Sequence, residues 1–239
     1  MGFADIHIHT HCSDGVSSPQ RTVDYVIARQ ELNLIAITDH DTIEGGLIAR
    51  DYLYSKASLA NRLEIVVGSE ISSLEGHIVG LFLEFDVPAK MSAEETVNAI
   101  HDQGGIAIAV HPYTFVYRVS KTLAELKGVA DRIKNMHFDA VEVINSNPTE
   151  LMSNWYTTWI NRTSLRLPEL GSSDGHFLSA IGRAFTEYRG ITASDFRKSI
   201  FENSVTAHGG VWGIGAFLSY LRERRTVRSE ATMLQEVEA

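Results

Sequence analysis

Histidine and carboxylate residues recur in short clusters along this chain of 239 residues, most of them at the end of an apolar run. The clusters are Asp5-Ile-His7-Ile-His9, Asp14-Gly15, Thr38-Asp39-His40-Asp41-Thr42, Gly68-Ser69-Glu70, Gly76-His77, Val110-His111-Pro112 and Ser173-Asp174-Gly175-His176. Imidazole nitrogens and carboxylate oxygens are ligands of zinc, manganese and iron. The pattern therefore indicates a site for divalent metal ions.

The spacing within the first cluster places its polar side chains on one face of a strand. Residues i and i+2 of a strand point the same way, so Asp5, His7 and His9 share a face. Asp174 and His176 repeat this spacing. One such pair alone fits a solvated strand face equally well. Recurrence of the same ending on at least four other expected strands favours metal binding.

Apolar strands and helical segments alternate along the chain and would position these clusters. We expect strands over 3–8, 34–38, 63–67, 77–82, 106–110, 140–144 and 168–171, and helices over 18–32, 43–59, 92–103, 123–136, 150–163 and 193–202. Short β-branched runs of this kind are typical of buried parallel strands. The predicted fold is an α/β, distorted (β/α)7 TIM-like barrel, in which the strand ends share one mouth.

Composition predicts a single globular domain over 1–225, followed by a polar C-terminal tail over 226–239. Hydrophobic residues make up 44% of the chain, and the net charge of −9 argues against a stable nucleic-acid complex or an anionic membrane surface. Cys12 is the only cysteine, which excludes an intrachain disulfide. Because we find no leader and no apolar stretch of membrane-spanning length, we expect a cytoplasmic protein.

Together these motifs resemble the polymerase and histidinol phosphatase (PHP) family, over residues 3 to 210, and its stand-alone metal-dependent phosphoesterases in particular. The resemblance implies a trinuclear site that holds two or three Zn, Mn or Fe ions. It assigns His7, His9, Glu70 and Asp174 to one ion, Glu70, His77 and His111 to a second, and Asp14, His40 and His176 to a third.

The activity implied is metal-dependent hydrolysis of a phosphoester, in a small phosphorylated metabolite or a nucleotide phosphomonoester. A hydroxide bridging two ions would attack phosphorus, and Glu70 would hold the ions at a fixed separation. Asp39 and Asp41 are candidates for orienting the ligand imidazoles. Arg183 and Arg118 are candidates for binding substrate phosphate, with a solvated surface arginine as the alternative for each.

Two other functions remain open on sequence grounds. An amidohydrolase-like C–N hydrolase would use the same metal site, although such sites often need a lysine at the mouth and none is expected there. A non-catalytic, metal-bound regulatory module is disfavoured by the complete set of ligands. The apolar segment 212–221 is a candidate interface for a homo-oligomer.

Overall fold

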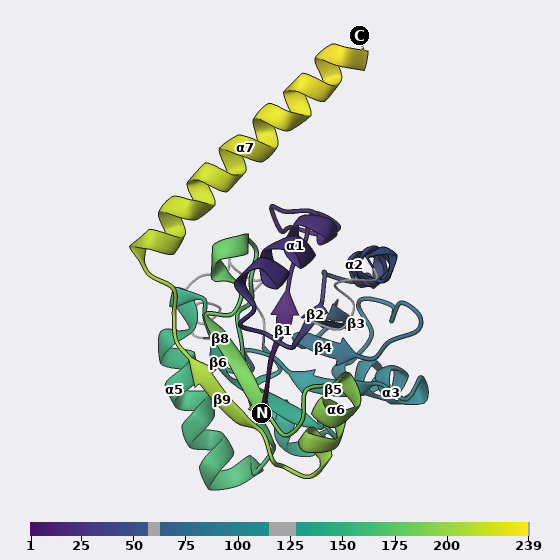
Figure 1. The fold of residues 1–239 in the computed structure, drawn as a ribbon. Helices are drawn as coiled ribbons and strands as arrows, with labels where there is room; N and C mark the ends of the chain where they lie inside the picture. Colours follow the sequence, from purple (N-terminus) through teal and green to yellow (C-terminus); the bar gives the residue numbers. More distant parts are fainter. Residues whose placement is uncertain (57–62, 115–127, 239) are drawn as a thin grey trace.

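The computed structural model describes residues 1–56, 63–114 and 128–238, with side chains described as far as residue 226. Its strands form one 9-stranded sheet in the order β7-β6-β5-β4-β3-β2-β1-β8-β9 (Figure 1). They are β1 (Gly2–Ile8), β2 (Leu34–Ile37), β3 (Glu64–Ser72), β4 (His77–Leu81), β5 (Ile106–Ala109), β6 (Ala140–Asn145), β7 (Glu169–Ser172), β8 (Ala184–Tyr188) and β9 (Thr206–Gly209).

The sheet curls until its two ends nearly meet. Strand β7 lies beside β8 and β9 at the far end of the sheet order. The backbone N–H of Gly171 donates to Thr186 Oγ1 at 3.0 Å, and that hydroxyl donates back to Gly171 O at 2.8 Å. Side-chain bonds thus join β7 to β8 where a regular ladder is not formed. The prediction of an α/β, TIM-like barrel is confirmed.

The middle of the sheet departs from the repeating βα pattern. Strand β3 continues through Gly68-Ser69-Glu70, beyond the end of the strand expected over 63–67, and pairs antiparallel with β4. A side chain at Gly68 would meet Gly80 O of β4 at 2.6 Å, so glycine permits this close pairing. Glu70 therefore projects from a rigid strand. Strand β8 pairs antiparallel with β1, and β9 pairs antiparallel with β8. Neither strand was expected from the sequence.

Helices cover the outside of the sheet (Figure 1). Their residue ranges agree in part with those expected from the sequence. They are α1 (Pro19–Arg29), α2 (Glu44–Ser55), α3 (Ala93–Asp102), α5 (Leu151–Ile160) and α6 (Ala193–Phe201). Ser18 caps α1, and Ser92 and Glu95 form a capping box at the start of α3. Helix α6 is capped by Thr192. Of the helix expected over 123–136, residues 123–127 lie outside the described residues, and η2 (Ala130–Asn135) is a 3-10 helix.

A long terminal helix, α7 (Ile214–Glu238), extends away from the barrel (Figure 1). It runs through residue 226 without a break, where the sequence suggested that a tail begins. Ala216 packs with Phe177 and Trp212, whereas Ile214, Phe217 and Leu218 are exposed. In the part of the chain that the structure describes, no helix has the length and apolar character needed to cross a bilayer.

Candidate metal centre

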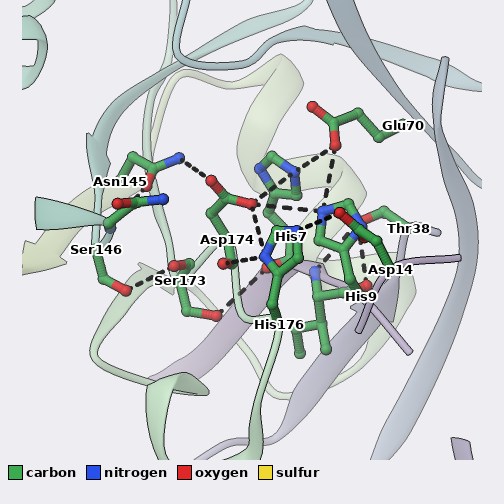
Figure 2. A network of polar contacts seen from close by, with 12 residues as sticks. His7, His9, Asp14, Thr38, Glu70, Asn145, Ser146, Ser173, Asp174 and His176 are labelled. Carbon is green, nitrogen blue, oxygen red and sulfur yellow. Dashed lines mark hydrogen bonds and ion pairs between the residues drawn. The ribbon is translucent and has the colours of Figure 1, made fainter. Parts of the chain in front are cut away.

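The barrel brings together every side chain that the sequence predicted as a metal ligand. They come from β1, β3, β4 and from the segments that follow β1, β2, β5 and β7. Figure 2 shows His7, His9, Asp174 and His176 turned toward one another, with Asp14 beside them. Strand β1 is buried on both faces, so Ile6 and Ile8 anchor the strand in the core while His7 faces the centre.

The ligand atoms form overlapping groups whose members all lie within 4.8 Å of one another. The groups are His7-His9-Asp174, His7-Glu70-His111, His40-Glu70-His77 and His9-Asp14-His40-His176. A distance of this size is what side chains converging on a shared cation require. The first and last groups match the sets that the family resemblance assigned to the first and third ions, apart from Glu70 in the first and His9 in the last.

Glu70 lies at the centre of this arrangement and is only 1% exposed. Its Oε2 lies 3.2 Å from both His7 Nε2 and His9 Nε2, and 3.4 Å from His40 Nδ1. Its Oε1 lies 2.9 Å from His77 Nδ1 and 3.0 Å from His111 Nε2. The two oxygens of one carboxylate thus face two separate sets of imidazoles. This is the geometry that a carboxylate bridging two ions requires.

Several buried imidazole nitrogens make no hydrogen bond with the described residues. They are His7 Nε2, both ring nitrogens of His9, His40 Nδ1 and His111 Nδ1. Buried polar atoms are normally paired, because leaving one unpaired costs ~1–3 kcal/mol. A cation among Glu70, His7 and His9 would satisfy His7 Nε2 and His9 Nε2, which both face Glu70 Oε2, and would offset the buried carboxylate charge. The residues present therefore fit divalent metal ions.

The electrostatics of the cluster point the same way. Burial disfavours the charged form of His9 and of His111, yet nearby carboxylates outweigh it and raise the pKa of each to about 9. Burial also opposes ionisation of Glu70 and Asp174, but the surrounding imidazoles hold the pKa of both well below the usual range. The buried carboxylates of the centre thus favour positive charge nearby. In the absence of metal ions, protonated imidazoles provide that charge.

Two regions of the centre differ in exposure. The inner group consists of His7, Glu70, His77, His111 and Asp174, whose side chains are at most 11% exposed. The outer group consists of Asp14, His40 and His176, with side chains 53%, 28% and 31% exposed. His9 lies between the groups, with Nδ1 3.4 Å from Asp14 Oδ1.

The outer group is held together by contacts between Asp14 and two imidazoles. His176 Nε2 lies 3.0 Å from Asp14 Oδ2, and His40 Nε2 lies 3.8 Å from the same oxygen. Partial burial opposes ionisation of Asp14, but His176, His9 and His40 lower its pKa to about 2. Asp14 is therefore ionised and lies near solvent.

The other residues singled out from the sequence take different positions. Asp39 accepts hydrogen bonds from the Thr10 backbone N–H at 2.7 Å and from Ser13 Oγ at 2.6 Å. Asp41 Oδ1 accepts one from Ser72 N–H at 2.7 Å. These bonds shape the backbone around the ligands, in contrast to the expected contact with imidazole rings. Arg183 is exposed and donates to Ser179 O at 3.1 Å, and Arg118 lies outside the described residues.

Two buried acids lie behind the ligands: Asp5, which the sequence placed in the first cluster without a role, and Glu142, which sequence reasoning missed. Asp5 accepts from the backbone N–H of Ser173 at 2.9 Å and of Gly182 at 2.8 Å, which ties β1 to the segment after β7. Glu142 of β6 contacts His7. A signal was present, because Glu142 interrupts the apolar strand Ala140–Asn145. A charged residue in a strand that is buried on both faces needs a partner inside the barrel.

Sequence comparison finds proteins that are similar to this chain. The chain is 39% identical over 154 residues to the uncharacterized protein MJ1587 of Methanocaldococcus jannaschii, and the match covers 60% of this chain and 81% of that one. It is 33% identical over 111 residues to a 5'-3' exoribonuclease of Haemophilus influenzae, covering 44% of this chain and 37% of that one.

Structural and family comparisons identify the fold. A solved structure from Bacteroides vulgatus, described as a two-domain protein containing a predicted PHP-like metal-dependent phosphoesterase, matches with a TM-score of 0.67 and 18% identity. The match covers 87% of this chain and 64% of that one. A family model described as PHP-associated matches residues 160–205. With its ligand clusters, its barrel and these relatives, the chain belongs to the PHP family.

Proposed function

We propose that this protein hydrolyses phosphoesters with the help of two or three divalent metal ions. The observation that carries the proposal is Glu70, a buried carboxylate whose two oxygens face separate sets of imidazoles at 2.9–3.4 Å. Divalent cations held there would polarise a phosphoryl oxygen and lower the pKa of water toward ~7. Zn, Mn and Fe all suit mixed nitrogen and oxygen ligands.

The chain's own residues divide the work between inner and outer groups. His7, His111 and Asp174 are buried and would hold their ions rigidly away from bulk water. Asp14 and His176 are partly exposed and would hold an ion where substrate phosphate arrives. Arg183 follows His176 closely in the sequence and its side chain is exposed. It therefore remains our candidate for a contact with substrate phosphate.

For the substrate, we propose a small phosphorylated metabolite or a nucleotide phosphomonoester. A second candidate is the 5' end of RNA, which the names of relatives in Haemophilus influenzae and Salmonella typhimurium favour. Those matches cover 37% and 29% of the relatives, so the rest of their length has no counterpart in the alignment. The net charge of −9 favours a transient encounter with RNA over a stable complex.

The proposal is tested by hydrolysis assays with Mn²⁺, Zn²⁺ or Fe²⁺ added to purified protein. The panel contains p-nitrophenyl phosphate, nucleoside monophosphates, sugar phosphates and a 5'-phosphorylated oligoribonucleotide, with N-acyl amino acids as C–N substrates. We expect phosphate or mononucleotide release that stops when a chelator is added. Cleavage of the C–N substrates alone would favour the amidohydrolase-like function, and no turnover of any compound would favour a regulatory module.

A further inference from the structure

Glu142 lies behind the metal ligands and is 1% exposed. Its Oε1 lies 3.1 Å from His7 Nδ1 and accepts a hydrogen bond from Ser172 Oγ. Its Oε2 accepts from the His111 backbone N–H at 2.8 Å and from Asn145 Nδ2 at 3.0 Å. One carboxylate thus contacts four separate groups around the inner end of the centre.

These contacts fix the protonation pattern of the His7 ring. A carboxylate only accepts hydrogen bonds, so each of its partners must donate. His7 Nδ1 therefore carries a hydrogen and points it at Glu142. The other nitrogen, Nε2, is left facing Glu70 Oε2 at 3.2 Å and Asp174 Oδ1 at 3.6 Å. In the neutral ring this nitrogen presents its lone pair to the metal site.

The same carboxylate reaches two further ligands. His111 has a φ of 29°, a left-handed backbone conformation that is strained for a residue other than glycine. The bond from its N–H to Glu142 helps to hold that conformation. Asn145 bridges Glu142 to Asp174, because its Nδ2 also lies 3.3 Å from Asp174 Oδ2. Glu142 therefore contacts His7, which faces Oε2 of Glu70, and also His111, which faces Oε1 of Glu70.

We propose that Glu142 is a positioning residue that sets the His7 tautomer and orients His111 and Asp174 for the inner metal ions. The proposal rests on the metal site of the proposed function. Hydrogen-bond partners behind metal ligands typically contribute 10–100-fold to metal affinity. We expect metal affinity to fall by that factor when the Glu142 carboxylate is replaced, although every residue that binds the metal is still present.

The test compares Glu142→Gln with Glu142→Asp. Glutamine has the shape of glutamate but only one acceptor oxygen, so its NH₂ group must face two donors. We expect Zn²⁺ to bind Glu142→Gln about 10–100-fold more weakly in competition with a chelator. In the Zn²⁺-loaded protein, ¹⁵N NMR of the histidine rings should show His7 with a hydrogen on Nδ1 and should lose that signal in Glu142→Gln. Glu142→Asp keeps the charge and should recover part of the affinity.

Glu187→Gln is the matched control, because Glu187 also bonds an imidazole, His208 Nε2 at 2.8 Å, away from the centre. It should leave Zn²⁺ affinity unchanged. A Glu142→Gln protein that is less stable to heat yet keeps wild-type Zn²⁺ affinity and the His7 signal would overturn the proposal. If Glu142→Gln does not fold, Glu142→Asp decides, since its shorter side chain should still weaken Zn²⁺ binding and wild-type affinity would contradict us. Failure of the unmodified protein to bind any of Zn²⁺, Mn²⁺ and Fe²⁺ would instead overturn the proposed function.

Discussion

The inner and outer groups of the metal centre differ in what holds their ligands. Inner ligands project from or directly follow the buried strands β1, β3, β4, β5 and β7, and Glu142 supports them from behind. Asp14 and His176 lie in loops, and Asp14 is 53% exposed. A rigid, dry site keeps its ligands in place before the ion arrives, whereas an exposed site must order them. We therefore expect tight inner binding and weaker, faster-exchanging outer binding.

Glu70→Gln should have the largest effect on the inner group and on activity. This change removes the charge that faces the inner imidazoles of His7, His77 and His111, so the inner ions should be lost together. A loss of several kcal/mol in transition-state stabilisation corresponds to about 10³-fold lower kcat/KM. Steady-state kinetics and metal content by elemental analysis measure it. Glu169→Gln, at an acid that pairs with Arg162 outside the centre, serves as the control and should behave as wild type.

Changing the outer group should have a smaller effect. His176→Ala removes one exposed ligand and leaves His7, Glu70 and His111 untouched. We expect loss of the weakly held ion alone and a decrease in kcat/KM of about 10–100-fold, the size of one well-placed electrostatic contact. Elemental analysis after dialysis should find the inner ions retained. Loss of all metal from His176→Ala would mean that the two groups are not separable.

The pH dependence of metal affinity should also distinguish the groups. Between pH 9 and 6.5, protons compete for His111, which belongs to the inner group alone, and for His9, which faces both groups. The pKa of each is raised to about 9. Inner affinity should fall by about tenfold per pH unit for each proton displaced. Burial lowers the pKa of His40 and the pKa of Asp14 is about 2, so neither holds a proton in this window. Chelator competition at several pH values should find a shallower slope for the outer ion, and equal slopes would contradict the assignment.

The metal-free protein should show the opposite trend in stability. Because the folded-state pKa of His9 and His111 lies above the unfolded value near 6.5, protonation stabilises the folded state fully below pH 6.5. That contribution is lost as pH rises through about 9. Thermal unfolding of chelator-treated protein should therefore give a lower Tm at pH 9 than at pH 6.5. A Tm that rises over this range would show that the imidazoles are not protonated.

The smallest effect should come from helix α7. Glu223 accepts hydrogen bonds from Ser17 Oγ at 2.6 Å and from Leu178 N–H at 3.1 Å, and so joins the loops that carry Asp14 and His176. Glu223→Ala removes these bonds, so ordering the two loops around the outer ion should cost about 1 kcal/mol more free energy. This corresponds to about fivefold weaker binding of the outer ion. Inner affinity should not change. Titration of Zn²⁺ into this variant and into the surface control Glu202→Ala measures the difference.

The sequence predicted the ligand cluster better than it predicted the sheet. His7 and His9 could be identified as ligands because similar polar endings recur on other strands of the sequence. The antiparallel β3–β4 pair was missed because an apolar run specifies burial but not strand direction. Glu142 was missed because its partners His7, His111 and Ser172 are brought together only by strands distant in sequence.

Titration calorimetry of Zn²⁺ into metal-free protein at pH 8 tests the central claim most directly. The account predicts a tight class of sites, abolished by Glu70→Gln, and a weaker class abolished by His176→Ala. A single class of equivalent sites, or binding that survives Glu70→Gln unchanged, would contradict it.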